Sequence, residues 1–315
     1  MIREGGPITV ERYMAQCNAH YYATRDPLGA VGDFTTGPEI SQMFGELVGA
    51  ALADCWLRAG APANATYVEL GPGRGTLAAD ALRVLAKAGL QPPVHFIETS
   101  SRLRAEQAAR VPGARWHESL NDLPAAPIML VANEFFDALP VRQWVGRQER
   151  RVTIDHDALS FTIEGAIHED SPAREAAAKA IAAHLARHGG VGLIIDYGHA
   201  RSSDGDTLQA VRAHAFANVL ADPGEQDLTA HVDFEALAKA AAIGGVSVAP
   251  LVSQGEWLER LGIHVRATGL VDAHPERSPE IAAAAGRLTA SDAMGDLFKV
   301  LAVHAADWPR PAGLE

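Results

Sequence analysis

Residues 66–75 read Thr66-Tyr67-Val68-Glu69-Leu70-Gly71-Pro72-Gly73-Arg74-Gly75, and this stretch decides the fold. Its first five residue types favour a β-strand, which leads directly into three glycines at alternating positions. Apolar residues then recur at helical spacing from Leu77 to Ala86, which predicts an α-helix. A strand that passes through a glycine turn into a helix lets the backbone contact a nucleotide-like ligand. The stretch therefore predicts a ligand site built on an α/β unit.

The spacing of the glycines narrows the ligand class. It is G-x-G-x-G, one residue shorter than the G-x-G-x-x-G of dinucleotide folds. Glu69 lies two positions before the first glycine, where a carboxylate suits a positively charged amino group better than a pyrophosphate. We therefore predict that Glu69, Gly71, Gly73 and Gly75 bind S-adenosylmethionine. A turn that only packs a helix on a sheet is the structural alternative, and a nicotinamide dehydrogenase is a more distant one.

Composition and charge exclude some classes of protein. The chain has 315 residues, of which 48% are hydrophobic, enough for a substantial core. Its net charge of −12 and the lack of a long basic stripe argue against nucleic-acid binding. Cys17 and Cys55 show no metal-ligand spacing, so we expect core thiols and no metal site. With no apolar signal region and no window long enough to span a membrane, we expect a cytoplasmic protein.

Strands and helices alternate from residue 66 onward, which predicts a doubly wound parallel sheet. A buried run at 191–197 predicts a further parallel strand, and 246–248 another. The earlier strands are expected at 66–70, 94–98, 114–117 and 127–132, with helices at 76–89 and about 101–110.

Other segments flank this core. A helix over 8–24 is expected with Thr9 as its cap, and Thr36 to Glu39 resembles a capping box that opens a helix of about 20 residues. Alternating runs over 141–163 predict antiparallel strands, and the polar stretch 198–232 is expected to be a long loop. Asp233 is expected to cap a helix over about 234–243. We thus expect a helical N-terminal cap (1–62), a core (63–255) with insertions at about 141–188 and 198–232, and a helical C-terminal segment (256–315).

Glu98 supports the cofactor prediction independently of the glycine turn. It ends the second strand, where a carboxylate can accept hydrogen bonds from both ribose hydroxyls of a nucleoside. Ser119 and Leu120 follow the third strand, where an adenine would lie, and their assignment depends on position alone. Asn133 ends the fourth strand and completes the predicted cofactor set.

The fourth strand continues into an acidic and aromatic sequence, Asn133-Glu134-Phe135-Phe136-Asp137. Ligands of parallel-sheet folds sit at the carboxyl ends of the strands. We therefore expect Glu134 and Asp137 to hold a cationic nucleophile, with the two phenylalanines excluding water; a surface loop with packed aromatic side chains is the alternative.

Three further residues are candidates for accepting a proton. Asp33 lies in a loop rich in glycine and proline that could close over a ligand. His199 follows the fifth strand, and His231 lies just before the Asp233 cap. Each of these residues has a structural alternative as a turn or hydrogen-bonding residue, and the sequence does not choose among the three.

These motifs together resemble the MidA family of class I S-adenosylmethionine-dependent methyltransferases. The resemblance covers about residues 7 to 270 and is carried by five strings. They are residues 32–42 (GDFTTGPEISQ), 69–75 (ELGPGRG), 133–140 (NEFFDALP), 196–199 (DYGH) and 227–234 (DLTAHVDF).

The resemblance implies a Rossmann-like class I methyltransferase fold with a central, mostly parallel, seven-stranded sheet. It also implies type II protein arginine methylation, giving symmetric dimethylarginine and S-adenosylhomocysteine. The substrate it implies is a protein, the quinone-site subunit of respiratory complex I, methylated during assembly. Because no mitochondrial presequence is seen, we expect a bacterial member of the family. Two alternatives remain: a methyltransferase of a small molecule or another side chain, and an assembly chaperone that binds the cofactor without turnover.

Overall fold

The computed structural model describes residues 2–24, 35–212 and 215–314 and has a mixed, mostly parallel sheet at its centre. Seven strands follow the order β16-β18-β11-β5-β2-β3-β4, and the short strands β15 and β17 pair beside this path. The predicted α/β class with a central, mostly parallel sheet is confirmed, and the two short strands bring the seven expected strands to nine. The strands are β2 (Thr66–Leu70), β3 (Val94–Ile97), β4 (Arg115–His117), β5 (Ile128–Asn133), β11 (Gly190–His199), β15 (Val232–Asp233), β16 (Ser247–Val248), β17 (Val252–Ser253) and β18 (Phe298–His304).

One strand of the sheet runs against the others and comes from the C-terminal part of the chain. β18 pairs antiparallel with β11 over seven residues, with Ile194 opposite Leu301, and it also pairs antiparallel with β16. The expected helical segment over 256–315 thus also contains a strand of the central sheet, which the sequence analysis did not predict. A short apolar run such as 298–304 has too few residues for its periodicity to distinguish a strand from a buried helix.

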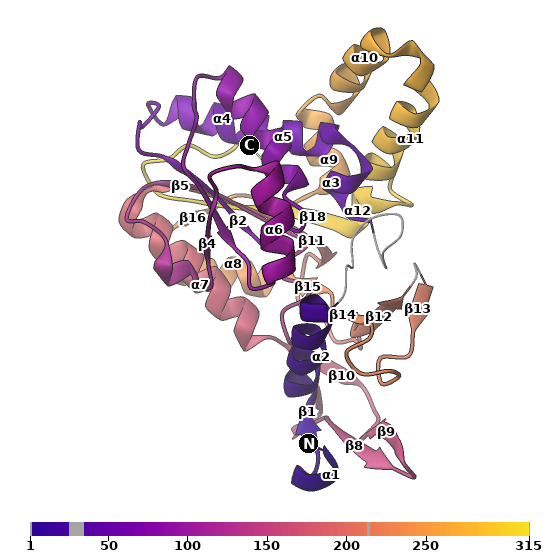
Figure 1. Cartoon of the computed structure of the whole chain (residues 1–315). Helices are drawn as coiled ribbons and strands as arrows, with labels where there is room; N and C mark the ends of the chain where they lie inside the picture. Colours follow the sequence, from indigo (N-terminus) through magenta and orange to yellow (C-terminus); the bar gives the residue numbers. More distant parts are fainter. Residues whose placement is uncertain (1, 25–34, 213–214, 315) are drawn as a thin grey trace.

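Helices cover both faces of the sheet (Figure 1). Side chains alternate along each strand, so Met129 and Val131 of β5 join one hydrophobic cluster while Leu130 and Ala132 join the other. The first cluster includes residues of α4 (Gln42–Arg58), α5 (Thr76–Lys87) and α9 (Gln254–Arg260). The second includes α7 (Pro172–His188) and α8 (Phe234–Ile243), and α6 (Ser101–Arg110) connects β3 to β4.

The long helix α4 starts later than the sequence predicts. Thr36 makes no side-chain cap, and the short helix α3 (Gly37–Ile40) ends before Ser41. The Ser41 hydroxyl accepts a hydrogen bond from the Met43 amide and caps α4 instead. α4 then packs against α5 within the core, so this part of the expected N-terminal cap is a layer of the central fold.

A third hydrophobic cluster forms a separate group of elements, which we call the accessory body. It consists of α1 and α2 with three small antiparallel sheets. α2 begins after Thr9, whose hydroxyl accepts a hydrogen bond from the Arg12 amide as predicted. The predicted loop 198–232 instead contains strands β12 to β14, which are too short to stand out in a polar sequence. The elements are α1 (Ile2–Gly5), β1 (Ile8–Thr9), α2 (Val10–Thr24), β6 (Arg142–Val145), β7 (Gln148–Glu149), β8 (Arg151–Asp155), β9 (Ala158–Phe161), β10 (Ile167–Asp170), β12 (Gln209–Arg212), β13 (Ala215–Ala217) and β14 (Asp227–Thr229).

The remaining elements lie between these layers and toward the C-terminus. α10 and α11 form a pair that projects from one end of the molecule (Figure 1). Within the described ranges, no helix is long and apolar enough to cross a membrane. The elements not yet given are η1 (Leu120–Asp122), α10 (Ile263–Ala273), η2 (Pro275–Arg277), α11 (Ser278–Thr289) and α12 (Met294–Leu297).

Candidate active site

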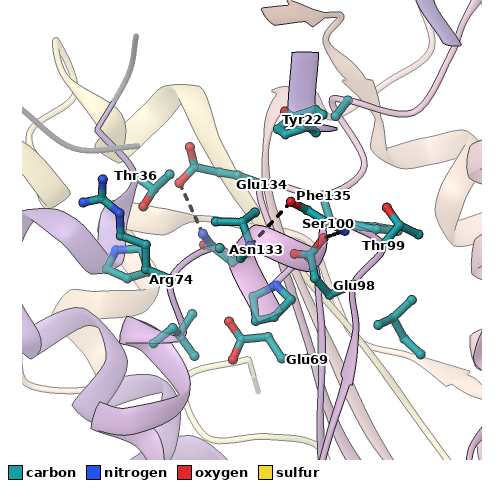
Figure 2. Close-up of a pocket in the computed structure, with 18 of the residues that line it drawn as sticks. Tyr22, Thr36, Glu69, Arg74, Glu98, Thr99, Ser100, Asn133, Glu134 and Phe135 are labelled. Carbon is teal, nitrogen blue, oxygen red and sulfur yellow. Dashed lines mark hydrogen bonds between the residues drawn. The ribbon is translucent and has the colours of Figure 1, made fainter. Parts of the chain in front are cut away.

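A cavity of about 590 Å³ opens at the carboxyl ends of β2, β3 and β5. Its volume falls within the range of small-molecule sites, roughly 300–1,000 Å³. Figure 2 shows its polar side chains, which come from segments far apart in the sequence. The lining includes Asn18, Tyr22, Thr36, Pro38, Glu39, Glu69, Gly71, Pro72, Gly73, Arg74, Ile97, Glu98, Thr99, Ser100, Glu118, Asn133, Glu134, Phe135 and Leu139.

The glycine turn forms one wall of the cavity. Gly71, Gly73 and Gly75 all have positive φ angles, of 58°, 53° and 77°, which side-chain-bearing residues rarely adopt. Gly71 and Gly73 line the cavity, whereas Gly75 precedes α5 as its N-cap. A Cβ atom on Gly71 would lie 3.1 Å from the Phe135 ring. The turn therefore needs glycine both for its backbone conformation and for its close packing against the loop after β5.

Glu69 lies at the floor of the cavity with its carboxylate almost wholly removed from water (Figure 2). The Tyr67 hydroxyl donates a hydrogen bond to Glu69 Oε2 at 2.7 Å. Burial raises the pKa of Glu69 from 4.5 to about 8, and the Tyr67 hydrogen bond only partly opposes this shift. A cationic ligand group in the cavity would favour the ionised carboxylate.

Glu98 is fixed at the end of β3 by the start of α6. Its Oε1 accepts a hydrogen bond from the Ser100 amide at 2.8 Å, and its Oε2 accepts one from Gln107 Nε2 at 3.2 Å. Burial raises the pKa of Glu98, and these two hydrogen bonds oppose the rise. Gln107 also donates to the Gly73 carbonyl at 2.7 Å, so one side chain connects Glu98 to the glycine turn.

Ser119 and Leu120, the two residues expected to lie beside the adenine, are not in the cavity lining. The neighbouring Glu118 lines the cavity. The Ser119 hydroxyl instead accepts a hydrogen bond from the Asn121 amide and caps η1. The short turn after β4 therefore occupies the expected region, but it presents a different residue to the cavity.

Glu134 has the most constrained backbone of the acidic residues at the site. Its φ is +50°, unusual for a residue with a side chain, and its amide donates to the Ile195 carbonyl at 2.9 Å. Glu134 Oε1 accepts a hydrogen bond from the Gly37 amide at 3.1 Å. It accepts a second from Asn133 Nδ2 at 3.2 Å (Figure 2). Burial and the neighbouring Asp137 raise the pKa of Glu134 to about 8. Asn133 and Glu134 thus occupy adjoining parts of the cavity.

Asp137 does not join Glu134 in the cavity, contrary to expectation. It is buried outside the lining, where its carboxylate accepts a hydrogen bond from the Ala138 amide at 2.8 Å and interacts with the Tyr197 hydroxyl. The two phenylalanines also separate: Phe135 lines the cavity, whereas Phe136 is fully buried in the second hydrophobic cluster. The difference arises because the chain turns sharply at Glu134.

The histidine candidates lie together but away from the cavity lining. His199 is 4.0 Å from Asp233, and His231 packs edge-on against the Tyr197 ring. Burial and the nearby His199 lower the pKa of His231. Asp33 lies outside the described residues. The structure therefore brings Glu134 to the cavity and places neither histidine there.

Helix α2 contributes cavity residues that the sequence analysis did not include. Asn18 and Tyr22 lie one helical turn apart and both line the cavity. The Tyr22 hydroxyl donates to Asp227 Oδ1 at 2.9 Å, and Asn18 Nδ2 donates to the carbonyls of Ala138 and Leu228 at 3.0 and 2.8 Å. In the sequence, the i, i+4 spacing of Asn18 and Tyr22 indicates that they lie on the same face of a helix. It does not indicate that this face lines a cavity.

The residues around the cavity fit S-adenosylmethionine. The left-handed glycines bring bare backbone to the cavity wall, as close contact with a ligand requires. Two buried carboxylates, Glu69 and Glu98, offer acceptors for an amino group and for paired hydroxyls. Glu134 supplies a third acceptor beyond the cofactor set.

Comparisons with known proteins agree with this fit. The sequence model of an S-adenosyl-L-methionine-dependent methyltransferase family matches residues 47–164 and 147–252. A Xenopus tropicalis protein named "Protein arginine methyltransferase NDUFAF7, mitochondrial" is 32% identical, covering 96% of this chain and 83% of the relative. The Drosophila melanogaster homologue is 35% identical, covering 95% and 82%.

A solved structure extends the similarity to three dimensions. A Burkholderia thailandensis protein crystallised with S-adenosyl-homocysteine superposes with a TM-score of 0.87 at 28% identity, covering 99% of this chain and 92% of that one. The match includes the central sheet and the accessory body, because almost the whole chain takes part in it. From its sequence and its fold, the chain belongs to the MidA family of S-adenosylmethionine-dependent methyltransferases.

Proposed function

We propose that this enzyme methylates arginine side chains of a protein and forms symmetric dimethylarginine. Support comes from one feature above the others: the Glu134 carboxylate lies in the same cavity as the glycine turn and Glu98. A guanidinium keeps its charge at physiological pH, so an acidic group beside the cofactor suits it as an acceptor. The names of the relatives, which are arginine methyltransferases, support the same substrate class.

Bound S-adenosylmethionine supplies a methyl group on an activated sulfonium, so the protein mainly has to bind and align the acceptor. Glu134 would accept charge-assisted hydrogen bonds from the guanidinium. The Gly37 amide and Asn133 hold one carboxylate oxygen in place, and both also favour the ionised form. Phe135 and Leu139, on the cavity wall, would exclude water from the transfer.

We further propose a complex I subunit as the protein partner and a bacterial cytoplasmic location. The family resemblance supports the partner. The curated relatives are named as mitochondrial proteins, and the cytoplasmic location stays a prediction from the sequence.

The decisive experiment compares methylarginine in a deletion strain that expresses either the wild-type enzyme or Glu134→Gln. Mass spectrometry should find an arginine that carries two added methyl groups with the wild-type enzyme and is unmodified with Glu134→Gln, because glutamine cannot hold a cation by charge. Calorimetry should show that the purified variant binds S-adenosylhomocysteine within about threefold of wild type, since Glu134 lies outside the cofactor set.

Glu164→Gln is the control, because Glu164 is exposed and lies outside the cavity lining. It should restore methylation. Undiminished dimethylarginine with Glu134→Gln would remove Glu134 from this role. A missing methyl group on a small molecule, with methylarginine unchanged, would favour the small-molecule alternative. Normal complex I assembly with a folded Glu134→Gln protein that transfers no methyl groups would favour the chaperone alternative.

A further inference from the structure

The loop after β5 is held in a conformation that its own sequence does not favour. Glu134 has a positive φ without being glycine, and such residues persist where the surrounding structure over-determines them. The loop directly after it, Phe135 to Asp137, carries side chains in opposite directions. The contacts that fix this loop therefore also fix where the Glu134 carboxylate lies.

Arg174 of α7 supplies one half of these contacts. Its side chain is buried and donates hydrogen bonds to four main-chain carbonyls. Two belong to the loop, Phe136 at 2.7 Å and Asp137 at 3.0 Å. The other two belong to the segment between β14 and β15, Ala230 at 2.8 Å and His231 at 2.6 Å. One guanidinium thus joins the loop after β5 to the segment that follows β14 of the accessory body.

Asp196, near the end of β11, supplies the other half. It is fully buried, and its Oδ2 accepts hydrogen bonds from the amides of Phe136 at 2.9 Å and Asp137 at 3.1 Å. Its Oδ1 accepts a further bond from the Tyr197 amide at 2.9 Å. Phe136 and Asp137 therefore have their amides bound by Asp196 and their carbonyls bound by Arg174. Side chains from β11 and α7 thus fix both the N–H groups and the C=O groups of these two residues.

Stability alone does not explain why Arg174 and Asp196 are buried here. Burying a guanidinium and a carboxyl group costs desolvation free energy, which here raises the pKa of Asp196, and well-packed apolar residues often stabilise a fold equally well. Buried groups that make all their hydrogen bonds add a single allowed geometry for the groups they bind. Here those groups are the peptides next to Glu134.

We propose that Arg174 and Asp196 are positioning residues for methyl transfer, acting through the loop that carries Glu134. The inference rests on the proposed function of Glu134. Arg174 and Asp196 do not line the cavity, so they act without touching either substrate. Their contribution is to keep the carboxylate in place while the rest of the fold keeps the cofactor residues in place.

The test compares Arg174→Lys with Arg150→Lys. Arg150 is a matched control, because it is another buried arginine whose guanidinium makes several hydrogen bonds, with Gln143, Asp206, Glu164 and the Ile163 carbonyl. None of these partners belongs to the loop after β5. Lysine keeps the charge at both positions, but its three donors on one nitrogen cannot reproduce the planar guanidinium.

Two measurements are made on each purified full-length variant. Hydrogen exchange with mass spectrometry should show faster exchange at residues 133–140 in Arg174→Lys and unchanged exchange there in Arg150→Lys. Methyl transfer from labelled S-adenosylmethionine into a lysate of the deletion strain should fall about 100-fold in kcat for Arg174→Lys, as a displacement near 1 Å predicts. The KM for S-adenosylmethionine should stay within about threefold.

The outcomes separate this inference from the proposed function. Unchanged exchange at residues 133–140, or equal loss of kcat in the two variants at equal stability, would overturn the positioning role. Label found on groups other than arginine would overturn the substrate assignment alone, since the exchange experiment needs no acceptor. If Arg174→Lys does not fold, Asp196→Asn takes its place, because asparagine keeps one oxygen for the two amides but removes the charge. It should show the same local exchange and about a 10-fold loss of kcat, and wild-type values for both would overturn the inference.

Discussion

At the scale of single residues, Glu69 is a carboxyl group buried within strand β2. Burial raises its pKa from 4.5 to about 8, so the folded protein keeps a proton that the unfolded chain releases between these values. Because the folded state binds more protons in this window, its stability falls as the pH rises from about 5 to about 8.

We expect Glu69→Gln to reduce this dependence on pH. Glutamine keeps an oxygen that can accept the Tyr67 hydrogen bond and has no proton to release. The slope of the unfolding free energy against pH, between pH 5 and 8, should become less negative by about 1.4 kcal/mol per pH unit, the value for one proton. Urea denaturation at several pH values measures it.

Glu235→Gln is the control for this titration. A hydrogen bond from the Ser202 amide and the nearby Lys239 lower the pKa of Glu235 to about 2, so its carboxylate is ionised in both states above pH 5. Its replacement should leave the slope unchanged. An unaltered slope in Glu69→Gln would show that Glu69 is already ionised at neutral pH.

The acidic residues at the strand ends could be predicted individually, because parallel strands bring their carboxyl ends to one edge of a sheet. Glu69, Glu98 and Glu134 were found in this way, and all three line the cavity. The prediction that Asp137 lines the cavity was wrong, because the direction in which a side chain points after the strand depends on how the backbone turns. A positive φ at a glutamate leaves no trace in the sequence, and the same holds for the contacts of Arg174.

At the scale of elements, the packing of α4 on α5 depends on small residues. A Cβ atom on Gly49 would lie 2.7 Å from the Ala81 Cα, closer than side-chain carbons approach a neighbouring backbone. In contrast, Gly286 lies in α11 with open space around it. Close packing therefore requires glycine at position 49, whereas position 286 has room for a side chain.

The same substitution should consequently have opposite effects at these positions. Gly49→Ala should destabilise the fold by about 1–3 kcal/mol, because the two helices must separate. Gly286→Ala should stabilise it by roughly 0.5–1 kcal/mol, because alanine loses less backbone entropy in a helix. Chemical denaturation of both variants measures the difference, and destabilisation by Gly286→Ala would contradict the open environment of α11.

The long elements could be predicted from sequence, whereas the short ones could not. Strand β2 and helices α5 and α6 begin within one residue of their expected positions because periodicity and turn residues agree there. Strands β12 to β14 have three or four residues each, and β14 packs against α2, about 200 residues earlier in the chain, a contact that local sequence patterns do not reveal. The capping box at Thr36 was wrong because Ser41, five residues later, offers an alternative cap.

At the scale of the whole molecule, the cavity is complete only in the folded protein, because segments far apart in the sequence line it. They include α2, the β2–α5 turn, the β3–α6 turn and the loop after β5. A ligand that contacts several of these segments binds the folded state and not the unfolded chain, so it should stabilise the whole protein.

We expect S-adenosylhomocysteine at about 100 times its Kd to raise the free energy of unfolding by about 2.7 kcal/mol. Glu98→Gln should reduce this gain at the same ligand concentration, because a neutral amide cannot accept two hydrogen bonds from paired hydroxyls without donating. Thermal unfolding with and without ligand measures the gain. Glu164→Gln, at an exposed position outside the cavity lining, serves as the control and should behave as wild type.

The placement of β18 also has a consequence for the newly made chain. β11 ends about 100 residues before β18 begins. At a synthesis rate of about 5–20 residues per second, the edge of β11 that pairs with β18 therefore stays unpaired for about 5–20 s. During that interval an apolar strand edge is open to pairing with other chains. The order in which the ribosome delivers the strands thus exposes the newly made chain to edge-to-edge aggregation until β18 emerges.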